Sequence, residues 1–212
     1  MAIIHFREDD ITTCLRRTME VSELYEMYVR GDGRATRRSV DDLLWLCEQH
    51  LQKKISIQYV SIPEDGTSIK AGFLALADGA YLIGLVEGMT DEDERFVLCK
   101  ELFHVMFDHE GIRNIDLATH LAEYASLFQT PDCEGEPQCS VAWENLAEIA
   151  AMEFLFPYDQ RLAHVNGGTT LDFGRLATRY GIPRYYVEIA CSPGNMQFLG
   201  RVIDRIRKSM AA

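Results

Sequence analysis

The most informative segment of the chain is Arg95-Phe-Val-Leu-Cys-Lys-Glu-Leu-Phe-His-Val-Met-Phe-Asp-His109, which departs by one residue from an H-E-x-x-H helix. In that motif, two histidines four residues apart bind a metal from one helical face, and the glutamate activates a water molecule. Glu101 and His104 match the motif, but Lys100 stands where the first histidine belongs. A lysine ammonium has no lone pair for a metal. The segment therefore predicts a metal-site helix that carries a cation in place of one ligand.

This segment has the periodicity of a buried helix. Its apolar positions recur at helical spacing and are Phe96, Cys99, Phe103, Met106 and Phe107. A polar stripe lies between them, made of Lys100, Glu101, His104 and Asp108. Charges of both signs on a buried face need partners, because an unpaired buried charge is costly. The sequence therefore predicts a second polar surface opposite this stripe.

A later helix offers such a surface. It is predicted from about Ser140 to Phe156 by its capping residue and its apolar spacing. Glu144 and Glu148 lie one turn apart on it, so both carboxylates point to the same side. We expect that side to face the polar stripe. Glu153 is expected to lie on the solvated face of the helix.

Before the first of these helices, the apolar period changes to two. Residues 55–62 alternate and are rich in β-branched side chains, which predicts a strand. Residues 69–76 and 80–86 are predicted as two further strands. Asp78-Gly79 joins the last two strands as a hairpin turn. The predicted fold class is therefore α+β, with a small, mostly antiparallel sheet packed against the helix pair and further helices at the C-terminus.

Other helical patterns flank this unit. Residues 1–38 predict an N-terminal helical leader, and Ser39 is suited to cap the helix that follows. The main domain is expected over residues 39–191, and a C-terminal helix over residues 192–212. The region from Leu171 to Ala190 resembles a helix-turn-helix pair, but it has few basic residues, which favours packing over DNA binding.

Charge and composition limit the partners. A formal net charge of -12 over 212 residues argues against a phosphate-binding surface, so no direct nucleic-acid partner is expected. The start of the chain lacks a basic segment followed by an apolar run, and no segment has the length of a membrane span. A cytoplasmic protein without membrane contact is therefore expected. The six cysteines are scattered without a C-x-x-C pair, which indicates reduced thiols.

Together these features resemble the ImmA/IrrE family of metallopeptidase-like proteins. The strand from Tyr81 to Val86, then Arg95-Phe96 and the motif from Lys100 to His104, resemble the family's strand and its Arg-Phe-x-x-x-His-Glu-x-x-His sequence. The segment from Glu144 to Pro157 is similar to the family's glutamate-rich helix. The segment from Leu176 to Ala190 resembles its closing helix pair.

The resemblance covers about residues 39–191 and implies a zincin-like helix pair. It implies that a metal is held by His104 and Glu144, with Glu148 beside the ligands and His109 at the place of a histidine that often follows the motif. It also implies a regulatory role, because members of the family act on helix-turn-helix transcriptional repressors.

Two functions from different classes stay open. As a zinc metalloendopeptidase, the chain would hold Zn²⁺ through His104, Glu144 and a substitute ligand, and Glu101 would act as general base on a repressor substrate. Asp108 and His109 are the candidate substitutes. Asp108 is better directed, since it follows His104 by four residues, whereas His109 follows by five.

As a binding protein, the chain would use Lys100 as a metal-surrogate cation. Its long side chain can reach Glu101, Glu144 or Glu148 and neutralise carboxylates that zinc would otherwise neutralise. No cofactor is then expected, and the chain would act by binding a protein partner such as a helix-turn-helix transcription regulator. We favour this pseudo-metallopeptidase, because loss of even a residue that supports a ligand lowers metal affinity about 10–100-fold.

Overall fold

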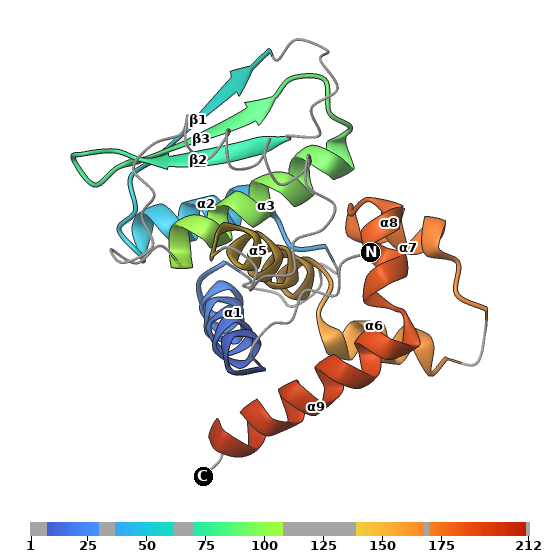
Figure 1. The fold of residues 1–212 in the computed structure, drawn as a ribbon. Helices are drawn as coiled ribbons and strands as arrows, with labels where there is room; N and C mark the ends of the chain where they lie inside the picture. The colour runs from blue at the N-terminus through green and yellow to red at the C-terminus, as the bar shows by residue number, and fades with distance from the viewer. Residues whose placement is uncertain (1–7, 30–36, 62–69, 108–138, 168–169, 211–212) are drawn as a thin grey trace.

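The computed structural model describes residues 8–29, 37–61, 70–107, 139–167 and 170–210. Its elements are, in chain order, α1 (Glu8–Tyr28), α2 (Val40–Gln49), β1 (Ile55–Val60), β2 (Ala71–Ala75), β3 (Tyr81–Val86), α3 (Asp91–Phe107), α5 (Cys139–Leu155), α6 (Tyr158–Val165), α7 (Phe173–Tyr180), α8 (Arg184–Ala190) and α9 (Pro193–Met210). The sheet lies over α3, α5 packs on the other side of α3, and α1 lies beyond α5 (Figure 1). The α+β class with C-terminal helices is confirmed.

The sheet has the strand order β1-β3-β2. The predicted hairpin is present: β2 and β3 are antiparallel, and Gly79 adopts a positive φ of 81° in the turn between them. However, β1 runs parallel to β3, so the sheet is mixed where mostly antiparallel pairing was predicted. Alternation identifies strands and a short turn identifies a hairpin, but neither determines on which side of β3 the chain places β1.

Side-chain caps mark the start of two helices, α2 at Ser39 as predicted and α3 at Thr90. The Ser39 hydroxyl accepts a hydrogen bond from the Asp42 backbone N–H at 3.1 Å, which caps α2. At the start of α3, the Thr90 hydroxyl accepts a hydrogen bond from the Asp93 N–H at 3.2 Å. Four acidic residues fill the first turn of α3, where the helix dipole favours negative charge. These local signals determine where the site-bearing helix starts.

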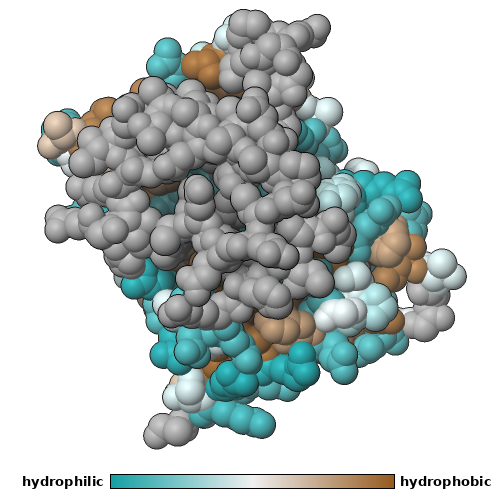
Figure 2. Space-filling model, viewed as in Figure 1, coloured by the Kyte–Doolittle hydropathy of each residue, from teal (hydrophilic) through white to brown (hydrophobic). Residues whose placement is uncertain are grey.

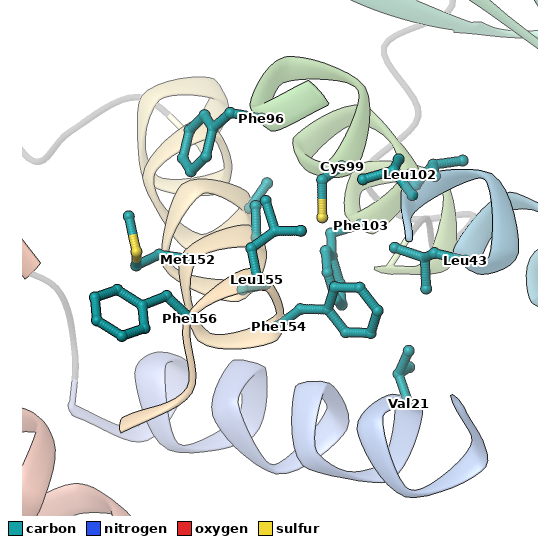
Figure 3. Close-up of a cluster of buried hydrophobic side chains, with 14 of the residues drawn as sticks. Val21, Leu43, Phe96, Cys99, Leu102, Phe103, Met152, Phe154, Leu155 and Phe156 are labelled. Atoms are coloured by element: carbon teal, nitrogen blue, oxygen red, sulfur yellow. The ribbon is translucent and has the colours of Figure 1, made fainter. Parts of the chain in front are cut away.

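The core lies where α3 and α5 pack together, and aromatic and aliphatic side chains of both helices point toward one another there (Figure 3). Helix α1 belongs to the same core. Ile11 and Leu15 are buried, and the ring of Tyr25 packs edge-on against Phe154 with 5.2 Å between centroids. The division into a leader, a main domain and a C-terminal helix stays a prediction, although α1 shares the core of the predicted main domain.

Glu153 does not lie on a solvated face, as the sequence suggested. Its residue is only 8% exposed, and its carboxylate pairs with the guanidinium of Arg161, which is 1% exposed. Its other oxygen accepts a hydrogen bond from the Tyr158 N–H at 2.8 Å. The prediction was wrong because helix α6 turns back after Pro157 and covers this side of α5. The helical periodicity of α5 alone does not indicate that another helix packs over this side.

Four cysteines, Cys14, Cys47, Cys99 and Cys191, are buried free thiols, which confirms the expectation of reduced thiols for them. Burial raises the pKa of Cys14 and of Cys47 to about 12, so these groups are protonated and inert.

In the face shown in Figure 2, the described residues along the lower edge are mostly hydrophilic, with small hydrophobic patches. Among the helices that the structure describes, none has the length and apolar character of a membrane span.

Candidate functional site

The polar stripe of α3 is buried, as its apolar neighbours require. Glu101 is 1% exposed and His104 is 7% exposed, while the side chain of Lys100 is 14% exposed. Strand β2 covers the stripe from the sheet side, where the ring of Phe73 stacks on the His104 imidazole with 5.3 Å between centroids and 18° between planes. These side chains are therefore held between the sheet and α5, away from bulk water.

Glu144 of α5 faces this stripe and is contacted from two sides. Its Oε2 lies 2.6 Å from the Nζ of Lys100, and its Oε1 lies 3.0 Å from the Nε2 of His104. The Lys100 ammonium also lies 3.1 Å from the Oε1 of Glu101. One lysine thus bridges a carboxylate of its own helix and a carboxylate of the facing helix. We call Lys100, Glu101, His104, Glu144 and Glu148 the charge cluster.

The Glu101 carboxylate depends strongly on this lysine. Within the described part of the chain, neither of its oxygens accepts a well-aligned hydrogen bond, so its charge is compensated by the ion pair with Lys100. A buried carboxylate without such compensation is costly. The position of Lys100 is therefore important for the stability of the helix pair as well as for any chemistry at the site.

The two glutamates of α5 have opposite electrostatic environments. Burial by itself raises the pKa of Glu144, but His104 and Lys100 outweigh burial and hold that pKa well below its usual range. The pKa of Glu148 is raised, because burial there exceeds the opposing effect of Lys100 and of a hydrogen bond from Tyr186. Glu144 is thus the carboxylate that Lys100 and His104 keep ionised, whereas burial has the larger effect on the pKa of Glu148.

Tyr186 is a member of this region that the sequence did not identify. Its hydroxyl donates a hydrogen bond to the Oε1 of Glu148 at 3.2 Å, and its ring stacks on Phe96 with 4.0 Å between centroids. The sequence predicted the helix that carries Tyr186, but nothing in its pattern distinguishes this tyrosine from the adjacent Tyr185. Only the tertiary contacts of Tyr186 with Phe96 of α3 and with Glu148 of α5 reveal its place in the site.

The donor set of the described residues does not fit a zinc ion. Zinc in proteins takes at least three protein ligands, and the site offers His104 and Glu144. No three His, Cys, Asp or Glu side chains of the described ranges are arranged to hold a metal. Lys100 occupies the place of the first histidine with a positive charge, which repels a metal. The candidate substitutes Asp108 and His109 lie outside the described residues.

Comparison with known proteins gives one family and one similar fold. The model of the IrrE N-terminal-like domain, Peptidase_M78, matches residues 53–192. Among solved structures, the chain is similar to a Mycobacterium tuberculosis transcriptional regulator, with 16% sequence identity and a TM-score of 0.43. That similarity covers 86% of this chain and 50% of the other, so the chain spans about half the length of the regulator. No curated protein matches the chain significantly.

Proposed function

Because the chain belongs to the Peptidase_M78 family of IrrE N-terminal-like domains, we propose that it is a cytoplasmic regulatory protein that keeps a metallopeptidase fold and acts by binding a protein partner. The observation that carries this proposal is the 2.6 Å contact between Lys100 Nζ and Glu144 Oε2. In the complete motif, the position of Lys100 belongs to a histidine that binds the metal. Here it holds an ammonium that binds the would-be metal ligand directly.

The charge balance of the cluster supports a cation in place of a metal. Glu101 and Glu144 are both within ion-pair distance of Lys100, and Glu144 is also within ion-pair distance of His104. A zinc ion would need lone pairs from His104 and Glu144 and would face the Lys100 ammonium at short range. Like charges in a buried site repel strongly, so ammonium and zinc are alternatives.

A helix-turn-helix transcription regulator is the proposed partner. The resemblance to ImmA/IrrE proteins implies this class, and the net charge of -12 supports it. Regulators that bind DNA present basic surfaces, and opposite net charges raise association rates between proteins. Binding without cleavage would then regulate DNA occupancy by competition or by release of the regulator.

Zinc analysis of the purified protein tests the proposal. We expect protein from zinc-replete medium to carry well below one equivalent by elemental analysis. Lys100→His should raise the occupancy, because it restores the motif. Lys100→Leu is the matched control, since it removes the cation without adding an imidazole, and it should stay zinc-poor. His104→Ala in the Lys100→His background should remove the gained zinc.

The alternative function is a zinc metalloendopeptidase with an unusual ligand set. Near-stoichiometric zinc in the unmodified protein would overturn the proposal and favour Asp108 or His109 as the third ligand. For the partner, we would mix the chain with helix-turn-helix regulators of the same genome and use size-exclusion chromatography and mass spectrometry. We expect an intact regulator in a complex that survives a chelator. Chelator-sensitive fragments would instead indicate a peptidase.

A further inference from the structure

Helix α8 brings one aromatic residue to the charge cluster and leaves its neighbour in solvent. The side chains of Val187 and Ala190 are buried, while Tyr185 is 67% exposed. Tyr186 is partly buried, and its ring lies nearly parallel to Phe96, at 24° between planes. Phe96 is fully buried on α3, one turn before Lys100. The ring contact therefore fixes the direction of the Tyr186 hydroxyl.

That hydroxyl reaches α5 at Glu148. The Tyr186 hydroxyl donates a hydrogen bond to Glu148 Oε1 at 3.2 Å, and among the described residues it is the donor to this carboxylate. Glu148 follows Glu144 by one helical turn, so both carboxylates face the same space between α3 and α5. The groups that act electrostatically on Glu148 are Lys100 and His104 of α3, Glu144 of α5, and Tyr186 of α8.

Two carboxylates of α5 thus compete for one ammonium. Lys100 lowers the pKa of both Glu144 and Glu148, which means that its charge acts on each. In the structure the ammonium binds Glu144, since Lys100 Nζ lies 2.6 Å from Glu144 Oε2. Glu148 is instead hydrogen-bonded to the Tyr186 hydroxyl. A hydroxyl donor that stabilises one carboxylate reduces that carboxylate's demand for the cation.

We propose that Tyr186 is a positioning residue of the charge cluster: its hydroxyl holds Glu148 and thereby leaves the Lys100 ammonium to Glu144. This rests on the proposed use of Lys100 in place of a metal ligand. The closing helix pair is then coupled to the cluster, since displacement of α8 removes the donor from Glu148. A partner that moves α8 would change which carboxylate binds Lys100.

The test compares Tyr186→Phe with Tyr185→Phe in metal-free protein. NMR follows the Glu148 carboxyl carbon, assigned with Glu148→Gln, and the Lys100 ammonium nitrogen, assigned with Lys100→Arg. We expect Tyr186→Phe to shift the Lys100 signal, because Glu148 loses its hydrogen-bond donor and then draws the ammonium away from Glu144. The Glu148 signal should shift as well, since its carboxylate exchanges the hydroxyl for the ammonium. Tyr185→Phe should leave both signals unchanged.

A double-mutant comparison separates positioning from packing. In the Glu148→Gln background, Tyr186→Phe should no longer shift the Lys100 signal, because the carboxylate through which it acts is absent. An unchanged Lys100 signal in Tyr186→Phe would overturn the proposal. So would a Lys100 shift of equal size in both backgrounds. Zinc bound by the unmodified protein would overturn the proposed function alone, because this comparison uses no metal.

Discussion

The ammonium of Lys100 and the carboxylate of Glu144 lie 2.6 Å apart on helices α3 and α5, although 44 positions separate them in the chain. The same ammonium contacts Glu101, which is almost inaccessible to water. One side chain therefore compensates charge on both helices of the central pair. The stability of this pair should depend on Lys100 to a degree that unfolding experiments can measure.

Lys100→Ala should cost about 3–5 kcal/mol of unfolding free energy at neutral pH, as expected when one partner of a buried ion pair is removed. Lys70→Ala is the control, because the Lys70 side chain is 49% exposed in its ion pair with Asp93. That change should cost at most about 1 kcal/mol. Urea unfolding measures both values. A Lys100 deficit below about 0.5 kcal/mol would mean that its ammonium is solvated.

The Lys100→Ala deficit should also shrink in acid. The pKa of Glu144 is lowered in the folded state, so its ionic contacts stabilise the protein above its unfolded pKa of about 4.3. That stabilisation is lost as pH falls through the lower folded pKa. Unfolding series at pH 7 and near pH 3 should therefore show a smaller difference between the two proteins at the lower pH. A constant difference would contradict the assignment to Glu144.

Glu153→Ala should destabilise the protein by about 3–5 kcal/mol, because it leaves Arg161 charged and buried without its carboxylate. Glu188→Ala is the matched control on an exposed helical pair, where Arg184 is 68% exposed. Its cost should stay within about 0.5 kcal/mol. Thermal unfolding followed by circular dichroism compares the two variants. Equal small effects would show that Arg161 finds water or another acceptor.

Gly181→Ala should cost about 1–2 kcal/mol, because Gly181 ends α7 with a φ of 60°, a left-handed conformation that disfavours a Cβ. The added methyl group would also displace the flexible end of Arg37, which lies over this glycine. Gly194→Ala is the control, since that helical position has open space around it. Chemical unfolding should show no loss for Gly194→Ala. If Gly181→Ala left the free energy of unfolding unchanged, the turn before α8 would tolerate another conformation.

Much of the fold followed from local patterns. Helical spacing predicted α3 and α5, the cap at Ser39 predicted the start of α2, and Asp78-Gly79 predicted the β2–β3 hairpin. These features depend on residues close in the chain, whose conformations and hydrogen bonds are largely local. The parallel pairing of β1 with β3 did not follow, since it depends on the return path of the chain.

By itself, the sequence determined that Lys100, Glu101 and His104 share one buried helical stripe, because helical geometry places them there. The contact of that stripe with Glu144 was an expectation based on charge and on family resemblance. Tertiary structure alone decided that Glu148 binds Tyr186 and that Glu153 binds Arg161. The physical reason is that a buried charge takes its partner from whichever element packs over it. Contacts between packed elements join residues that follow no regular spacing in the sequence, so no sequence pattern reveals them.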